Sequence, residues 1–188
     1  MATIDLSLLP APDVVESLDY ETVFAQRKAS FLALVPVDIR DSVSAALELE
    51  SEPITILLQE SAYRELLLRN RINAAARSVM LAYATGSDLD HLAALFGVIR
   101  IDGEEDSRLR ARTQLSLEGY STAGPTLSYV FHATSASNEV HDATVNSPEP
   151  GNINVVVLAV PSETHPNGVP NQALLDIVQS KVSAEDIR

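Results

Sequence analysis

The sequence predicts an α+β fold, in which a bundle built on a long helix precedes a small α/β domain. This domain contains an antiparallel strand pair and is expected to be incomplete at its C-terminal end. Across residues 54–85 no glycine or proline interrupts a helical pattern of apolar residues. Two stretches rich in β-branched residues, 139–145 and 152–160, flank a turn-rich connector. We therefore expect a helical region over 1–118 and the small domain over 119–188.

Three helices are expected in the first half of the chain. The first begins after the capping residue Asp19 and ends before Pro36, and a short second helix covers 38–50. The third has Pro53 in its first turn and would run for about 31 residues, or roughly 46 Å. A helix of this length exceeds what the core of a small domain can cover. Other helices, from this chain or a partner, should therefore pack along it.

One face of the third helix is predicted to be a protein interface. Its apolar residues recur at spacings of three and four. Its polar side offers the pairs Glu60–Arg64 and Glu65–Arg69 in the favourable i, i+4 order. The predicted interface residues are Leu68, Ile72, Val79, Tyr83, Arg64 and Arg71.

The cluster Ser87, Asp88, Asp90 and His91 allows two interpretations. Carboxylates beside an imidazole resemble a metal or acid/base site, but neighbouring residues supply no third and fourth ligand. Alternatively, Ser87 and Asp90 form a capping box, and the acidic residues complement the dipole of a helix start. The second interpretation gives every polar residue a structural role, so no bound metal is predicted.

Glycine positions set the ends of these helices. Gly86 and Gly97 each follow a predicted helix and should adopt positive φ, whereas Gly124, before Pro125, should be extended.

Arg108, Arg110 and Arg112 form a basic run after an acidic turn. We interpret the run as the solvated start of a helix capped by Asp106 or Ser107. The alternative is a patch that binds an anion or a partner.

The C-terminal part should contain a helix from Pro125, two antiparallel strands joined by the connector 146–151, and a last helix capped by Asn171. A two-stranded sheet is marginal by itself. We therefore expect an open strand edge beside 155–160 and a third strand that is missing or supplied by another chain.

Composition excludes several classes of function. The 26 acidic and 13 basic residues give a formal net charge of −13, which repels nucleic acids and anionic membrane surfaces. The absence of Cys excludes disulfides and thiolate metal sites. The start, MATIDLSLLPAPD, lacks the features of a signal peptide, so we expect synthesis and folding in a cytoplasm.

Catalytic and cofactor motifs are also missing from the sequence, which has no glycine-rich phosphate loop, nucleophile elbow or His-Glu-x-x-His helix. We therefore expect no cofactor and no small-molecule substrate. The alternative is a small cytoplasmic metal-dependent enzyme that uses His132, His141 and Asp142. A generic helical adaptor is a third hypothesis.

Three stretches resemble a known family. They are DLSLLPAPDVVESLDYETVFAQRKASF, LESEPITILLQESAYRELLLRNRINAAARSVMLAYATGSDLDHLAALFGV and EGYSTAGPTLSYVFHAT. Together they are similar to the baseplate assembly protein J family of contractile-tailed bacteriophages and tailocins. The middle stretch is the most specific because it is long and ungapped.

The resemblance implies a structural wedge component of the virion tail baseplate, assembled in the cytoplasm of the host bacterium. Helices of family members bundle with a second copy and another wedge protein, and later domains link wedges into a ring around the hub. That ring transmits host binding to sheath contraction, and the family has no catalytic residues. Family members usually continue well beyond a sequence such as AEDIR, so we expect this chain to be truncated or short.

Overall fold

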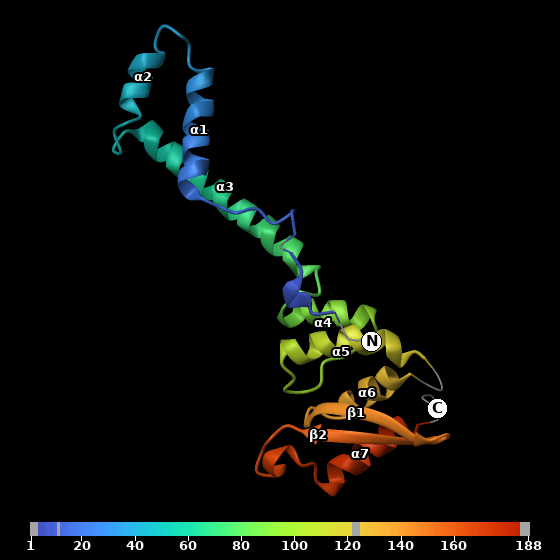
Figure 1. Cartoon of the computed structure of the whole chain (residues 1–188). Helices are drawn as coiled ribbons and strands as arrows, with labels where there is room; N and C mark the ends of the chain where they lie inside the picture. Colours follow the sequence, from blue (N-terminus) through green and yellow to red (C-terminus); the bar gives the residue numbers. More distant parts are fainter. Residues whose placement is uncertain (1–3, 11, 122–124, 185–188) are drawn as a thin grey trace. The chain divides into compact units, whose positions relative to one another are not determined.

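The computed structural model describes residues 4–10, 12–121 and 125–184. The chain forms two compact units, which we call the helical unit, Leu9–Ser78, and the α+β unit, Met1–Leu8 with Val79–Arg188 (Figure 1). The α+β class expected from the sequence is confirmed. The boundary between a helical region over 1–118 and a small domain over 119–188 stays a prediction.

The helical unit consists of α1 (Tyr20–Leu34), α2 (Arg40–Ala46) and α3 (Pro53–Ser78). The predicted cap of α1 is confirmed, because the Asp19 carboxylate accepts a hydrogen bond of 2.9 Å from the Thr22 backbone N–H. The Thr22 hydroxyl, followed by that backbone N–H, lowers the pKa of Asp19. Helix α2 is shorter than the predicted 38–50.

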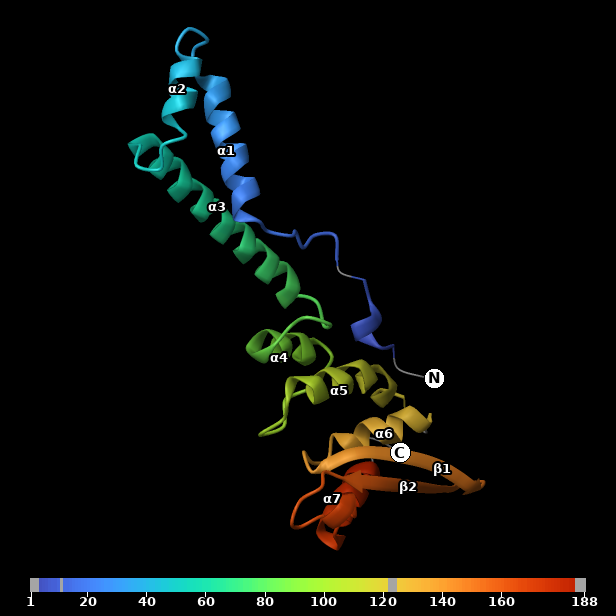
Figure 2. The ribbon, with the colours of Figure 1, turned by 60° about the vertical axis from the view of Figure 1, so that its left-hand side comes forward.

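Helix α1 packs beside α3 in both ribbon views (Figures 1 and 2). An ion pair of 2.5 Å joins Arg27 of α1 to Glu65 of α3. The segment before α1 is held by Asn73, whose amide accepts from the Glu16 N–H at 3.1 Å and donates to the Glu16 carbonyl at 2.8 Å. The face of α3 that carries Asn73 and Ala62 is therefore committed to contacts within the unit.

Helix α3 ends at Ser78 and not near Gly86, so the predicted length is wrong. Beyond Ser78 the chain forms turns and a bend up to Tyr83, and Ala84 and Thr85 then lead into α4. Val79 and Tyr83 therefore follow α3 and do not lie on it. The physical reason is tertiary, because a side chain of a later helix binds backbone carbonyls of this segment.

Four helices of the α+β unit surround its sheet or precede it: α4 (Gly86–Leu95), α5 (Asp106–Gly119), α6 (Thr126–Thr134) and α7 (Gln172–Val182). Short 3-10 turns lie at η1 (Leu6–Leu8) and η2 (Pro166–Gly168). The predicted cap of the last helix is confirmed, since Asn171 accepts from the Leu174 N–H at 2.9 Å. Pro125 is the N-cap of α6, one residue outside the helix.

The predicted positive φ is confirmed at two glycines. Gly86 has φ +54° and Gly97 has φ +69°. Gly97 lies just beyond α4, as expected, whereas Gly86 is the first residue of α4 and is separated from the end of α3 by the turns. Gly124, predicted to be extended, lies outside the described residues.

Strands β1 (Val140–Glu149) and β2 (Asn152–Ala159) pair antiparallel, as predicted. The predicted connector 146–151 is wrong, because β1 continues through most of it and only Pro150 and Gly151 form the turn. The register shifts between Asn146 and Glu149, where Pro148 lacks the N–H that a regular ladder needs.

One face of this sheet is buried. Its residues share a core with α6 and α7; the members are Ala133, Val140, Ala143, Val157, Ala159, Leu174, Val178 and Val182. The residues of the other face include Val156 and Leu158, which are exposed. Within the described residues the sheet has two strands, so β2 keeps one edge that no strand pairs. Whether a further strand completes the sheet stays a prediction.

Candidate interaction surface

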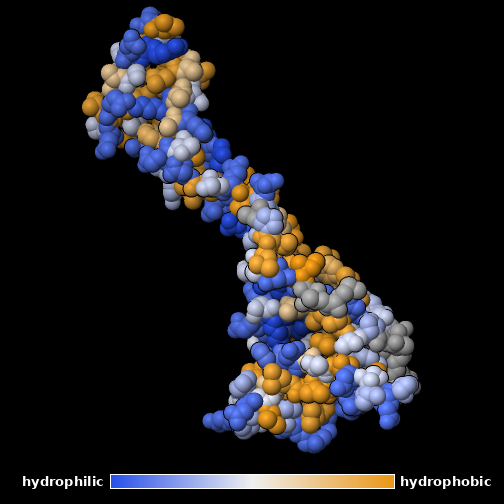
Figure 3. Space-filling model, in the orientation of Figure 1, coloured by the Kyte–Doolittle hydropathy of each residue, from blue (hydrophilic) through white to orange (hydrophobic). Residues whose placement is uncertain are grey.

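The helical unit exposes much of its apolar side-chain surface (Figure 3). Among its described residues the buried apolar side chains are few: Val23, Val35, Leu47 and Ala62. Its exposed large apolar residues are far more numerous: Leu9, Val14, Leu34, Val37, Ile39, Leu49, Ile54, Ile56, Leu57, Tyr63, Leu67, Leu68 and Ile72. Exposed apolar residues that gather on one face mark a site of protein contact, whereas scattered ones are normal on a protein surface.

Many of these residues lie along α3. At 3.6 residues per turn, one line of exposed side chains runs through Ile56, Tyr63 and Leu67, and a second runs through Leu57, Leu68 and Ile72. We call these six residues the α3 face. They lie on the side of the helix away from the buried Thr55, Ala62 and Asn73.

Four of the six residues predicted for the interface lie on or beside the α3 face. Leu68 and Ile72 are 66% and 61% exposed. Arg64 pairs with Glu60, as the i, i+4 spacing predicts, and Arg71 is exposed. The pair Glu65–Arg69 is confirmed at 2.7 Å.

Val79 and Tyr83 are also exposed, but they belong to the turns after α3 in the α+β unit. The structure therefore contradicts the prediction that they continue the same helical stripe. They remain candidates for an interface only as separate exposed apolar side chains.

The capping box predicted for Ser87 and Asp90 is wrong. The N-cap of α4 is Thr85, without a side-chain hydrogen bond, and Ser87 lies inside the helix. The Asp106 carboxylate, from the start of α5, accepts the Gly86 N–H at 2.9 Å instead. Asp90 pairs with Arg100 at 2.6 Å. A capping interaction exists, but a distant residue provides it.

Arg100 joins the two helix starts. Its guanidinium contacts Asp90 and, at 2.7 Å, Asp106. Burial disfavours the charged form of Arg100, but the hydrogen bonds to these carboxylates outweigh it and raise the pKa of Arg100. The Gly86 N–H, followed by the Arg100 guanidinium, lowers the pKa of Asp106. Asp106 is therefore not the cap of its own helix, whose N-cap is Glu105.

The predicted helix start is confirmed at Asp106, but its arginines are not solvated and are not a free anion-binding patch, because guanidinium groups of the run bind carbonyls within the unit. Arg108 donates to the carbonyls of Thr134 and Ser137 at 2.7 and 2.8 Å, and also to that of Val140. Arg110 donates to Leu81 and Ala84, each at 2.7 Å. The run is neither a solvated helix start nor a free anion-binding patch.

Arg112 is buried, and it meets the buried carboxylate of Glu104 at 2.6 Å. Glu104 Oε1 also lies 3.3 Å from Arg108 Nε. Burial lowers the pKa of Arg108, and the charge of Glu104 opposes that effect. Sequence analysis missed Glu104, although its spacing of four and eight residues from Arg108 and Arg112 was a usable signal.

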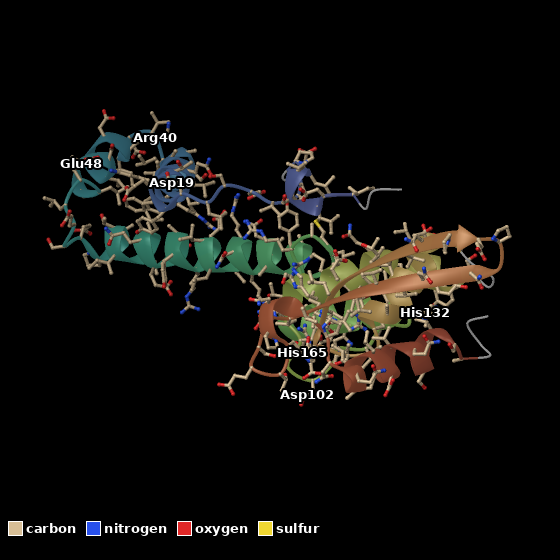
Figure 4. The ribbon with its side chains drawn as sticks, turned by 60° about the horizontal axis from the view of Figure 1, so that its bottom comes forward. Asp19, Arg40, Glu48, Asp102, His132 and His165 are labelled. Carbon is tan, nitrogen blue, oxygen red and sulfur yellow. The ribbon has the colours of Figure 1, made fainter. Side chains whose placement is uncertain are left out.

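The residues of the enzyme hypothesis are not assembled into a site. His132 is buried on α6, with Nε2 3.2 Å from the Gly119 carbonyl (Figure 4). His141 and Asp142 are exposed at an irregularity of β1, and Asp142 accepts the Ala143 N–H at 2.8 Å. His132 and Asp142 thus make local backbone contacts, His141 is exposed, and the enzyme hypothesis is left without support.

His165 is a structural residue that sequence analysis did not single out. It is buried in the loop before η2, and its Nδ1 accepts the Asn171 N–H at 3.3 Å (Figure 4). Its Nε2 lies 3.5 Å from Glu139. The imidazole thus ties the loop to the start of α7.

Metal ligands do not cluster in the described part of the chain. Among residues 4–10, 12–121 and 125–184, no group of three or more His, Asp or Glu side chains is placed to hold a metal ion. In those same residues, no helix is both long and apolar enough to cross a membrane.

An exposed apolar face on the helical unit, and arginines of α5 that bind groups inside the α+β unit, are features typical of a protein that packs against other proteins. Residues 50–102 match the model of the baseplate J-like N-terminal domain, and residues 121–188 match that of the baseplate J-like central domain. The chain is 42% identical over 203 residues to baseplate protein J of Escherichia phage P2. That alignment covers 100% of the chain and 66% of the relative.

The chain therefore belongs to the baseplate J family. The resemblance found in the sequence is confirmed, and with it the assignment to the structural proteins of the phage tail baseplate. The chain spans slightly less than two thirds of the length of its relative.

Proposed function

We propose that this chain is a wedge component of a contractile tail baseplate. In this proposal the helical unit packs through the α3 face against a second copy and another wedge protein. The α+β unit then helps to link wedges into a ring around the hub. Membership of the baseplate J family supports a place in the baseplate, and the exposed α3 face supports contact with other proteins through this helix.

The α3 face is the observation that carries the proposal. Burial of a Leu, Ile or Tyr-sized side chain stabilises a complex by about 1.5–3 kcal/mol. Association costs roughly 4–15 kcal/mol in lost translational and rotational freedom. The six residues of the face are 49–66% exposed, so burying all of them would contribute roughly half of that full-burial value for each, which is comparable to the cost of association.

The exposed side of the sheet supports the second part of the proposal. Val156 and Leu158 are exposed there, beside the strand edge that no described strand covers. Exposed apolar edges of this kind pair readily with other chains.

Substitution of Ile72 by Asp tests the α3 face. Ile72 is 61% exposed, so the isolated chain should unfold at the same temperature as the parent. In a complex the new carboxylate would be buried without a partner, so assembly should be lost. Sedimentation velocity over a range of concentrations measures self-association, and co-purification with co-expressed baseplate proteins measures contact with other components.

The matched control is Ser51→Asp, which adds the same charge at an exposed turn residue before α3, away from the α3 face. It should leave both self-association and co-purification unchanged. If Ile72→Asp also assembles like the parent, the α3 face is not the interface.

A further inference from the structure

Segment 79–85 has the sequence of a helix but forms turns, in which the Met80 carbonyl accepts the N–H groups of Tyr83 and Ala84, each at 2.9 Å. Its residues are Val, Met, Leu, Ala, Tyr, Ala and Thr, which include several strong helix formers and neither glycine nor proline. Helix α3 nevertheless ends immediately before it, at Ser78. Because neither glycine nor proline ends the helix there, hydrogen bonds and packing at the break must end it.

Those contacts are visible on both sides of the break. The Ser78 hydroxyl donates to the Ala75 carbonyl at 2.9 Å, and so competes with the N–H of Val79 for the same oxygen and slightly destabilises a continued helix. Arg110 of α5 donates to the carbonyls of Leu81 and Ala84, each at 2.7 Å. The Leu81 carbonyl would accept the Thr85 N–H if the helix continued.

Packing also favours the turn. Ala84 is buried in a core with residues of α4 and α5, and Leu81 packs against that core. On its other side the segment is less constrained. A hollow of about 410 Å³ lies beside Ala82, between the N-terminal residues 4–7 and α5. The turn is thus fixed by the buried Ala84, by the partly buried Leu81 and by one arginine, with an open hollow beside Ala82 between them.

Gly86 has a backbone conformation suited to a helix end. Its φ is +54°, which is unusual for the first residue of a helix such as α4. Glycine with a positive φ commonly occupies the position just beyond the last residue of a helix. A helix continued through Thr85 would meet Gly86 already in the conformation that ends it.

We propose that segment 79–85 is a helix–turn switch held in its turn form by Arg110. In the helical form α3 runs from Pro53 to Thr85 and gains about 10 Å at 1.5 Å per residue. At 3.6 residues per turn, Val79 and Tyr83 then fall on the line of Leu68 and Ile72.

The helical form therefore displays a longer apolar face than the turn form. A helical partner that packs on the full line favours the helical form by its differential affinity, whichever form is more populated in the free chain. This link to a partner rests on the proposed function. The switch itself is a property of the isolated chain and can be tested without any partner.

The test is the Cα chemical shift of Ala82 and Ala84 in the full chain labelled with 13C-alanine. In Arg110→Ala both shifts should move downfield into the helical range, because the two carbonyls lose their donor. The matched control is Arg108→Ala, which removes another arginine of α5 whose guanidinium binds the carbonyls of Thr134 and Ser137. It should leave the two alanine shifts unchanged.

Ser78→Ala provides a second route with Arg110 intact, and it decides the matter if Arg110→Ala does not fold. Loss of the hydroxyl should move the same shifts in the same direction by a smaller amount. Shifts of Ala82 and Ala84 that stay at their parent values in every folded variant would show a fixed corner and overturn the switch. Either result leaves the Ile72→Asp test of the α3 face unaffected.

Discussion

The carboxylate of Glu104 accepts a hydrogen bond of 2.6 Å from the Arg112 guanidinium, and the two side chains are 0% and 6% exposed. Arg112 continues to the Ser135 hydroxyl at 3.2 Å and to the Ile99 carbonyl at 3.2 Å. One buried ion pair thus connects α5 to the turn before it and to the residue that ends α6. The α+β unit depends on this charge pair as well as on its small apolar cores.

Replacement of Glu104 by Ala should destabilise the chain by about 3–5 kcal/mol, because Arg112 would be left buried without its counter-charge. Urea unfolding followed by circular dichroism measures the loss. The matched control is Glu105→Ala, since Glu105 is exposed and its side chain makes no capping bond. Equal midpoints for Glu104→Ala and the parent would show that the pair contributes nothing.

The starts of helices were predictable from the sequence because their signals are local. Asp19, Pro53 and Asn171 each act within one turn of their own helix. The end of α3 was not predictable, because the Leu81 carbonyl is bound by Arg110, 29 residues further along the chain. The same argument applies to the α4 start, where Asp106 replaces the local cap expected at Ser87.

The candidate site was predictable in part. The apolar periodicity of α3 identified Leu68 and Ile72 correctly as members of a face that the chain does not bury. The role of the arginines could not be found from periodicity, because solvated and buried arginines give the same pattern. Glu104, four residues before Arg108, was the one local hint that the run faces inward.

Low pH should weaken the contact between the starts of α4 and α5, because it protonates the Asp106 carboxylate that forms this contact. Its pKa is lowered from 3.8 by the Gly86 N–H and then by Arg100, so the folded pKa lies below the unfolded one. The stabilisation is therefore complete above the unfolded pKa and is lost as the pH falls through the folded pKa. Asp106→Asn should flatten the pH dependence of unfolding below about pH 4, and Ser87→Ala should not.

Thermal unfolding between about pH 2 and pH 6 measures this difference, because that range brackets the carboxylate titration. If the unfolding temperatures of the parent and of Asp106→Asn fall equally as the pH is lowered, another carboxylate controls the loss of stability in acid. Ser87→Ala serves as the control because Ser87 lies inside α4 and is exposed, so a change within about 0.5 kcal/mol is expected.

Two glycines with positive φ should differ in their tolerance of a side chain. Gly86 has φ +54°, and no atom lies within 4 Å of the position that a Cβ would take, so Gly86→Ala should cost about 1 kcal/mol from the backbone alone. Gly97 has φ +69°, and its Cβ would lie 2.8 Å from the Tyr120 hydroxyl. That hydroxyl donates to the Phe96 carbonyl at 3.2 Å.

Gly97→Ala should therefore destabilise the chain more than Gly86→Ala, by strain and by displacement of Tyr120. Chemical unfolding of both variants gives the comparison. The double change Gly97→Ala with Tyr120→Phe should recover part of the difference, because it removes the atom in closest contact. Equal losses in the two single variants would mean that Tyr120 moves aside without cost.

The last prediction concerns the free edge of β2. Alternate amides of an antiparallel strand point away from its partner, so those of 153–159 that do not face β1 have no ladder acceptor in the described residues. They should exchange hydrogen quickly in the isolated chain and slowly in the assembled baseplate, where a neighbouring chain pairs with the edge. Amides of 175–178, inside α7, should be equally protected in both and provide the control. Equal, strong protection of 153–159 in the two states would mean that the sheet is complete without a partner, and the proposal that this edge joins subunits would fail.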